Sequence, residues 1–312
     1  VFSCLADDAR IEVRFTVVPG SPFATDLRTH LERADMRVVA WEDVTPDRFD
    51  LAISPSSNGD LHRLGIPLIT LPHGAGHHKH RVTENGFTGE VSGLSRAQLV
   101  RGGRVVPRAI GLSHPDQLEV LRHGCPEAVE RARVIGDPCY DRLRASIPMR
   151  ERYRCELGVE DRKLVLVTST WGRNSLFGRQ PELASRLIDA LPPDSYRVAL
   201  VLHPNIWDQH SGYQVRLWIA HARLRGLLVV PPEQGWQAAL VASDIVVGDH
   251  GSVTFYAACL GTPLLLAEFG TEEVVGGSPM AELGDRARRL APDRLREAID
   301  RAEPVAGHDA LT

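Results

Sequence analysis

The sequence predicts an α/β protein built from two Rossmann-like domains. Short apolar runs rich in β-branched residues alternate with amphipathic stretches along the chain, and the alternation forms two successive series of about six strands each. Near-continuous apolar strands separated by helices are typical of a parallel sheet that is covered on both faces. A length of 312 residues is sufficient for two domains of about 150 residues each.

The composition excludes several classes of protein. A hydrophobic content of 43% and a charged content of 24% are ordinary for a globular protein. The formal net charge of −4 gives no support for nucleic-acid binding, which requires a clustered basic excess. No apolar run approaches the ~18 residues of a transmembrane helix. The five cysteines are dispersed and never form CxxC, which is typical of reduced thiols. We therefore expect a cytoplasmic protein, with attachment to a membrane surface left open.

The first series of strands predicts an N-terminal domain over residues 1–145. Helical patterns are expected at 25–34 and 115–124. A Rossmann-like domain begins with a strand, yet the opening residues VFSCLADDAR do not form a strand pattern, so we expect this domain to lack its opening strand. The expected strands are 11–18, 36–41, 51–54, 67–71, 108–113 and 132–136.

The second series predicts a C-terminal domain over residues 146–312. A polar, charge-rich stretch at 139–163 precedes it, and helical patterns are expected at 181–191 and 214–226. Two domains of this kind are expected to face a common cleft. The expected strands are 163–170, 197–203, 227–230, 244–248, 263–266 and 287–290.

The clearest candidate site follows the strand at 244–248. Ligands of open parallel sheets bind beyond the carboxyl ends of the strands, where the N-termini of helices offer free N–H groups. Here Asp249, His250, Gly251 and Ser252 stand between the strand and a helix expected from about Val253. Gly251 permits close backbone approach, and Ser252 can cap the helix or donate to an anion. The motif favours a phosphate site. A capped helix that binds no ligand would have the same sequence pattern and is the alternative.

Two other strands of the second domain also end in polar residues. The strand at 163–170 ends in Thr170 and is followed by Arg173, which pairs a hydroxyl donor with a guanidinium. The strand at 197–203 ends in His203, directly before Pro204. Three polar strand ends in one domain predict a ligand that carries a diphosphate.

These residues resemble a known family. The run SDIVVGDHGSVTFYAACLGTPLLL (243–266), together with LHPN (202–205), resembles the nucleotide-donor domain of GT-B-fold transferases. The closest resemblance is to the CDP-glycerol glycerophosphotransferase (teichoic-acid polymerase) family. RVIGDPCYDRL (133–143) and VTSTWGRN (167–174) resemble further elements of that family. There the strand, acidic residue, serine and helix hold the donor diphosphate, which implies this role for Asp249, Gly251 and Ser252.

The resemblance implies a transferase that moves a glycosyl or glycerol-phosphate group to a hydroxyl acceptor. The donor would be a nucleotide diphosphate, either CDP-glycerol or a UDP-sugar. It would need no obligatory cofactor or metal, because helix N-termini and basic side chains can stabilise the departing charge. Non-hydrolysing UDP-sugar 2-epimerases share the architecture, so an epimerase and a non-catalytic nucleotide-sugar-binding protein remain alternatives. Two departures from the family pattern are Pro72, where an aromatic residue is usual, and the His250-Gly251 pair.

The stretch LPHGAGHHKH (71–80) resembles the part of the family's first domain that carries a catalytic His-Gly element, which the resemblance places at His73 and Gly74. His73 directly follows a strand, and an imidazole with a pKa near 6.5 can accept a proton from an acceptor hydroxyl, so His73 is the expected general base. The later residues are expected to form a mobile polar loop in which His77 and Lys79 contact a phosphate of the acceptor. A metal would need three or four converging ligands, which adjacent histidines of a short turn do not supply, so none is expected.

A second basic stretch, SRAQLVRGGRVVPRA (95–109), contains four arginines and no acid. Arg101 and Arg104 are candidates for an anion site on the acceptor side, since a phosphate-bearing or lipid-linked acceptor would need one. A solvated loop is the alternative.

Overall fold

The structure is a computed structural model that describes residues 8–19, 34–84, 86–232 and 234–307, together with positions 5, 27, 31 and 32. The chain divides into two compact units. The first comprises Val1–His77 and Arg81–Pro138, and the second comprises His78–His80 and Cys139–Thr312. The expected division at residues 145–146 therefore lies within the second unit, and three residues of the histidine-rich stretch pack with that unit.

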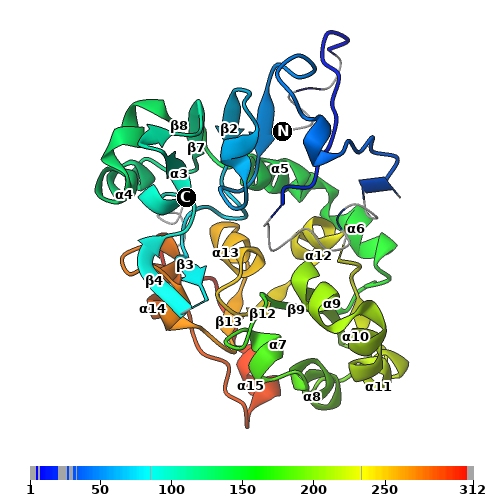
Figure 1. Cartoon of the computed structure of the whole chain (residues 1–312). Helices are drawn as coiled ribbons and strands as arrows, with labels where there is room; N and C mark the ends of the chain where they lie inside the picture. The colour runs from blue at the N-terminus through cyan, green and yellow to red at the C-terminus, as the bar shows by residue number, and fades with distance from the viewer. Residues whose placement is uncertain are drawn as a thin grey trace. The chain divides into compact units, whose positions relative to one another are not determined.

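A parallel sheet of four strands forms the centre of the first unit (Figure 1). Its order is β1-β2-β7-β8, with Ile53 opposite Ile69 and Ile110 opposite Ala132. Four of the expected strands are thereby confirmed. The strands are β1 (Ala52–Ser54), β2 (Leu68–Thr70), β7 (Ala109–Leu112) and β8 (Ala132–Val134).

The two other strands expected in this unit are wrong in extent. Phe15 and Val38 form a single isolated parallel bridge, in which the Phe15 N–H donates to the Arg37 carbonyl at 3.0 Å. Ile11 and Val13 remain 43% and 36% exposed, whereas Val18 packs against the cluster of Leu61, Leu64 and Leu68, so only the end of the apolar pattern at 11–18 contributes to the core. The helix expected at 25–34 lies largely outside the described residues, as does most of the segment expected to lack a strand.

Two hairpins were not expected from the sequence. One pairs β3 (His80–Thr83) with β4 (Gly86–Val91), and the other pairs β5 (Val100–Arg101) with β6 (Arg104–Val105). The second turn consists of Gly102 and Gly103, with φ of +55° and +72°. A two-residue turn of this kind requires positive φ at both positions, and Gly-Gly is among its usual sequences. The remaining elements are η1 (Trp41–Asp43), η2 (Leu61–Arg63), α3 (Arg96–Leu99), α4 (Asp116–Gly124) and η3 (Pro126–Arg131).

The second unit has a parallel sheet with the order β11-β10-β9-β12-β13. Numbered within the unit, this is the order 3-2-1-4-5 of a Rossmann fold. The expected strand at 287–290 is reduced to one parallel bridge between Leu266 and Arg289 at the edge. The five strands are β9 (Lys163–Ser169), β10 (Tyr196–Leu202), β11 (Leu228–Val229), β12 (Ile245–Gly248) and β13 (Leu264–Leu266).

Helices cover both faces of this sheet. Val165, Val167 and Val247 contribute to one core cluster with residues of α8, α10 and α15. The alternate residues Leu164 and Leu166 are also fully buried, as near-continuous apolar strands predict. The helices are α5 (Pro138–Ser146), η4 (Ile147–Met149), α6 (Arg150–Glu156), α7 (Leu176–Arg179), α8 (Leu183–Ala190), α9 (Pro204–His210), α10 (Gly212–Trp218), α11 (Ala220–Leu224), α12 (Trp236–Ala242), α13 (Ser252–Cys259), η5 (Thr271–Glu273), α14 (Pro279–Arg286) and α15 (Leu295–Asp300).

In the part of the chain that the structure describes, no helix combines the length and the apolar character that crossing a bilayer would require.

Candidate functional site

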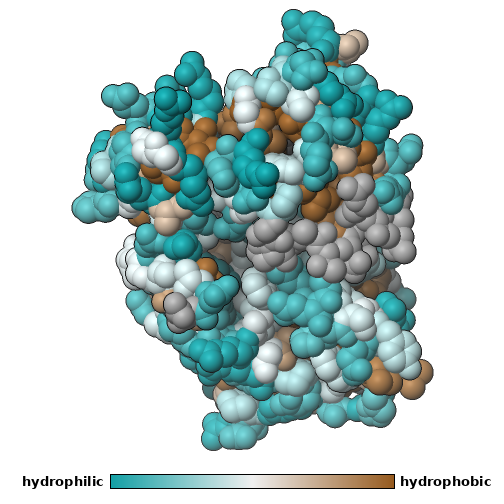
Figure 2. All heavy atoms as spheres, viewed as in Figure 1, coloured by the Kyte–Doolittle hydropathy of each residue, from teal (hydrophilic) through white to brown (hydrophobic). Residues whose placement is uncertain are grey.

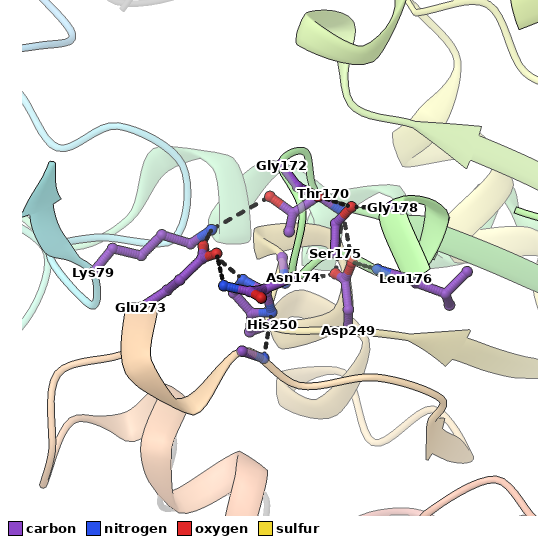
Figure 3. Close-up of polar contacts among 12 residues, drawn as sticks. Lys79, Thr170, Gly172, Asn174, Ser175, Leu176, Gly178, Asp249, His250 and Glu273 are labelled. Atoms are coloured by element: carbon purple, nitrogen blue, oxygen red, sulfur yellow. Dashed lines mark hydrogen bonds and ion pairs between the residues drawn. The ribbon is translucent and has the colours of Figure 1, made fainter. Parts of the chain in front are cut away.

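The site of interest lies where the strand order of the second unit reverses. The chain moves outward from β9 to β10 and β11, and then returns to β12 on the other side of β9. Because the carboxyl ends of parallel strands lie at one edge, the loops after β9 and β12 meet there, at the point where open α/β sheets bind ligands. The Thr170 N–H lies 3.1 and 3.0 Å from the two carboxylate oxygens of Asp249, which joins the two loops (Figure 3).

Asp249 holds these loops in place. Its side chain is fully buried. Its oxygens accept hydrogen bonds from Ser169 Oγ (3.1 Å), Leu176 N (2.8 Å) and Gly251 N (3.0 Å) in addition to Thr170 N. Protein donors surround both carboxylate oxygens of Asp249. In this geometry the side chain therefore fixes the positions of the two loops and has no free oxygen with which to contact a ligand.

The loop after β12 leads into α13 without a side-chain cap. Gly251 is the N-cap residue and Ser252 is the first helical residue, so Ser252 does not itself occupy the cap position. A Cβ at Gly251 would lie 3.0 Å from Asp249 Oδ1 and 3.3 Å from Thr170 N, which leaves little space for any side chain there. The first N–H groups of an α-helix have no partners within the helix and carry a partial positive charge. This end of α13 therefore suits an anion.

The loop after β9 adds polar and cationic groups. Thr170 is only 6% exposed, whereas Arg173 is exposed. Within the described residues, the Arg173 guanidinium has neither a hydrogen bond nor an ion pair. Ser175 caps the short helix α7 by accepting from Gly178 N at 3.0 Å, which ends the loop.

Lys79 lies with these second-unit residues, although we expected it on the acceptor side. Val275 N donates to the His78 carbonyl at 2.9 Å, and Lys79 forms an antiparallel bridge with Val274. The His78 ring is 5.1 Å from the Phe255 ring and His78 is only 7% exposed, so the expectation of a mobile polar loop is wrong for this part of the stretch. The ammonium lies 3.4 Å from Thr170 Oγ1.

Glu273 is the second partner of Lys79, at 3.8 Å. It is 8% exposed, and its carboxylate accepts hydrogen bonds from Asn174 Nδ2 and His250 Nε2, each at 3.0 Å (Figure 3). Burial alone would raise the pKa of Glu273, but the hydrogen bond from His250 and the charge of Lys79 outweigh it and hold that pKa below its usual value. Burial lowers the pKa of Lys79, against the opposing effect of the Glu273 and Asp249 carboxylates.

His250 is enclosed by the protein. Gly270 N donates to His250 Nδ1 at 3.0 Å, so the proton of the neutral ring is on Nε2, which donates to Glu273. The residue is fully buried, and a Cβ at Gly270 would lie 2.9 Å from the ring. Both ring nitrogens are therefore engaged, and the expected direct contact between His250 and a donor does not fit this geometry.

Two residues of this network, Asn174 and Glu273, were missed in the sequence. Asn174 lies in the VTSTWGRN stretch, and Glu273 follows the strand at 263–266 after a glycine. The rule that polar residues after strand ends form sites could have identified both.

His203 lies at the carboxyl end of β10 as the N-cap of α9. Its Nδ1 accepts from Asn205 N at 3.1 Å, and its ring is 6.3 Å from the Trp171 ring. Its part in donor binding stays a prediction.

The first unit contains the other residues of the histidine-rich stretch. His73 is exposed in the turn after β2, followed by Gly74 with φ of +63°. His77 Nδ1 lies 2.9 Å from the Ser92 carbonyl, which can only accept, so Nδ1 carries the proton. Among the described residues, its buried Nε2 has no partner. Burial lowers the pKa of His77 to about 4. His77 is therefore a fixed, neutral ring, and not the mobile loop residue that we expected.

Arg101 and Arg104 are paired across the β5–β6 hairpin. Arg101 donates to the carbonyls of Ala97 and Val100, whereas the exposed Arg104 has no ion pair within the described part of the chain. Like charges directly opposite each other disfavour a hairpin unless an anion compensates. The acceptor-side role of both stays a prediction.

No group of three or more His, Cys, Asp or Glu side chains is arranged to hold a metal ion among the described residues. Independence of a metal stays a prediction.

Comparisons with known proteins give structural similarities at low sequence identity. No protein-family model matches the sequence, and no curated protein matches it. One similar structure is the wall teichoic acid polymerase TagF, with 17% identity, a TM-score of 0.42 and coverage of 65% of this chain and 49% of that chain. Another is HepE of Anabaena in complex with UDP, with 16% identity, a TM-score of 0.43 and coverage of 93% of this chain and 88% of that chain.

HepE in complex with UDP-glucose is also similar, with 16% identity, a TM-score of 0.44 and coverage of 88% and 77% of the two chains. This chain spans about half the length of the TagF chain.

Proposed function

We propose that the second unit binds the diphosphate of a nucleotide donor between the loops after β9 and β12, and that the chain is a GT-B-type transferase. Positive groups lie on these two loops and on His78–His80, the segment that packs with the second unit, and they support the proposal most directly. The N-terminus of α13 has no side-chain cap, Lys79 reaches Thr170, and Arg173 is exposed. A diphosphate has the charge and the acceptor oxygens that such groups recognise.

Lys79 supports the proposal because its present contacts are weak. An ammonium group has three donors, and the distances to Thr170 and Glu273 are 3.4 and 3.8 Å. The group is 36% exposed, so it can exchange water for a phosphate oxygen without leaving its position. Asn174 and His250 hold the Glu273 carboxylate, which orients the ammonium group of Lys79.

The chemistry differs with the group transferred. In glycosyl transfer the bond from the sugar carbon to the diphosphate breaks and a nucleoside diphosphate leaves. In glycerol-phosphate transfer the bond between the two phosphates breaks and a nucleoside monophosphate leaves. In both reactions negative charge grows on a phosphate oxygen, which the α13 N-terminus, Lys79 and Arg173 would stabilise.

Within this proposal, Ser252, Thr170 and Arg173 contact the donor, while Asp249 and His250 position the loops. His203 is assigned to the donor because it ends the neighbouring strand β10. His73 is assigned as the general base that takes the proton of the acceptor hydroxyl, on the basis of its place after β2 and the family resemblance. Arg101 and Arg104 are assigned to an anionic group of the acceptor.

The test is a calorimetric titration with UDP, CDP, UDP-GlcNAc and CDP-glycerol, with uridine as an uncharged comparison. Of the 36 basic residues outside histidine only Lys79 and Lys163 are lysines, which provides a matched pair. Lys163 is exposed at the first residue of β9, at the amino end of the strand whose carboxyl end leads to Thr170. Lys79→Ala is expected to weaken diphosphate binding by about tenfold or more, and Lys163→Ala to leave it unchanged.

Incubation with each donor, followed by phosphorus NMR, then distinguishes the alternatives. Release of nucleoside diphosphate or monophosphate on addition of a hydroxyl acceptor supports a transferase. Conversion of UDP-GlcNAc to its 2-epimer supports the epimerase, and binding without turnover supports a binding protein. If no nucleotide diphosphate binds, or if Lys79→Ala binds like the wild type, the proposed site is wrong.

A further inference from the structure

Helices α10 and α11 of the second unit bury one face. Val215, Ile219 and Ala222 are 0%, 3% and 2% exposed, and their spacing of four and three residues places them on one side of a helix. All three belong to the core cluster of the unit. Ile219 lies between the two helices. Its N–H donates to the Val215 carbonyl at 3.2 Å and its carbonyl accepts from Arg223 N at 2.9 Å, so the four-residue hydrogen-bond pattern of a helix continues across the junction.

The opposite face is apolar as well. Tyr213, Leu217 and Leu224 are 72%, 55% and 88% exposed, and they are spaced by four and seven residues, which again defines one side of a helix. Trp218 beside them is 48% exposed, and the inner part of its ring packs against the rings of His210 and Phe177, at centroid distances of 4.9 and 6.0 Å. Figure 2 shows hydrophobic side chains at the lower right edge, where Figure 1 places α11. The outward face of a helix that already packs on a core is ordinarily polar, yet Tyr213, Leu217 and Leu224 stay largely uncovered by the residues that the structure describes.

Basic residues flank this apolar stripe. The sequence from Gly212 to Gly226 contains three arginines and one histidine and no acidic residue. Arg216 and Arg223 are exposed and seven residues apart, so both lie along the same side of the stripe. Neither guanidinium has an ion pair or hydrogen bond within the described ranges of the chain. Arg225 forms an ion pair with Asp189.

We infer that the α10–α11 surface, defined by Tyr213, Leu217, Trp218, Leu224, Arg216 and Arg223, binds an anionic lipid bilayer. Amphipathic helices that lie in the plane of a membrane insert aromatic and aliphatic side chains below the headgroups and place arginines at the level of the phosphates. Tyrosine and tryptophan are suited to this boundary because one part of each ring is apolar and the other is polar.

Charge favours a bilayer over a second copy of the chain. In a symmetric pair this surface would face itself, which would gather the guanidiniums of Arg216 and Arg223 from both copies at one contact, and the stretch from Gly212 to Gly226 offers them no acidic residue. A bilayer with anionic headgroups supplies the compensating charge. The net charge of the chain is −4, so attraction to an anionic membrane must come from a local basic surface such as this one. The inference does not depend on the proposed nucleotide site.

Vesicle co-sedimentation tests the inference with the whole chain. We expect the protein to sediment with vesicles of phosphatidylcholine and phosphatidylglycerol, to bind phosphatidylcholine alone much less, and to lose binding as salt rises. Leu217→Asp with Leu224→Asp should lower the partition coefficient by about tenfold or more. Arg216→Gln with Arg223→Gln should lower it by about fivefold per arginine, on the anionic vesicles only.

Ile147→Asp is the matched control, since Ile147 is 49% exposed in η4 of the same unit and lies outside this surface. Its binding should equal that of the wild type, and circular dichroism should show that every variant is folded. Failure of the wild type to bind anionic vesicles, or undiminished binding by the double leucine variant, would overturn the inference. A dimer in sedimentation velocity that Leu224→Asp converts to a monomer would also overturn it, because the surface would then join two copies.

Discussion

Replacing Asp249 by asparagine should destabilise the second unit by about 3 kcal/mol, because an amide accepts hydrogen bonds at only one of its two terminal atoms, whereas this carboxylate accepts at both. One oxygen accepts from Gly251 N at 3.0 Å and the other from Leu176 N at 2.8 Å. Whichever way the amide turns, its NH₂ group faces one of these backbone donors. A buried donor without a partner costs about 1–3 kcal/mol, and loss of the charge weakens the remaining bonds, each worth about 1.5–3 kcal/mol to a carboxylate.

Urea unfolding followed by tryptophan fluorescence measures this loss. Four of the five tryptophans belong to the second unit, so the signal reports mainly on it. With a urea slope of about 3 kcal/mol/M, the midpoint should fall by about 1 M at unchanged slope.

Asp161→Asn is the control, since Asp161 is exposed in the turn before β9 and should change the free energy of unfolding by less than about 0.5 kcal/mol. A midpoint for Asp249→Asn that matches the control would refute the reasoning, because the carboxylate would then not hold the two loops.

Three further predictions concern single side chains. Ser252→Ala should weaken diphosphate binding by about 1–3 kcal/mol in calorimetry with little change in thermal stability, and unchanged affinity would move the anion site elsewhere. His73→Ala should reduce turnover by about 10²-fold with nearly intact donor affinity, and full turnover would remove it as the base. The pKa of His77 is lowered from 6.5 to about 4 in the folded chain. As the pH drops from 6.5 to 4, the unfolded chain therefore binds a proton at His77 before the folded chain does, and the free energy of unfolding should fall. The decrease should reach at most about 3 kcal/mol, and His77→Asn, which keeps a donor for the Ser92 carbonyl, should remove it, as circular dichroism in urea would show.

Strands with continuous apolar sequence were predictable. The five strands of the second sheet and four of the first match the expected ranges, with β10 beginning one residue earlier than expected, because burial on both faces demands an unbroken run of apolar side chains. The runs at 11–18 and 36–41 contain charged residues and form only one bridge. The hairpin at Gly102-Gly103 was predictable from the sequence although we did not expect it, since a pair of glycines favours a two-residue turn.

The site was predictable in its location but not in the roles of its residues. Thr170, Asp249 and Ser252 were expected in the site because they follow the carboxyl ends of strands, where parallel sheets bind their ligands. The burial of His250 against Gly270 and Glu273 was not visible, because these residues are 20 and 23 positions away. Lys79 is more distant still, 91 positions from Thr170, and its place depends on how His78 packs against Phe255.

The α/β class, most of the strands and the strand ends that carry polar residues follow from the amino-acid sequence alone. These are properties of short windows, where alternation, glycine and proline act over a few residues. The 3-2-1-4-5 strand order, the full set of hydrogen bonds to Asp249 and the placement of Lys79 beside Thr170 become visible in the folded chain alone. Those features depend on which distant segments pack together, and burial and hydrogen-bond partners exist only after that packing has occurred.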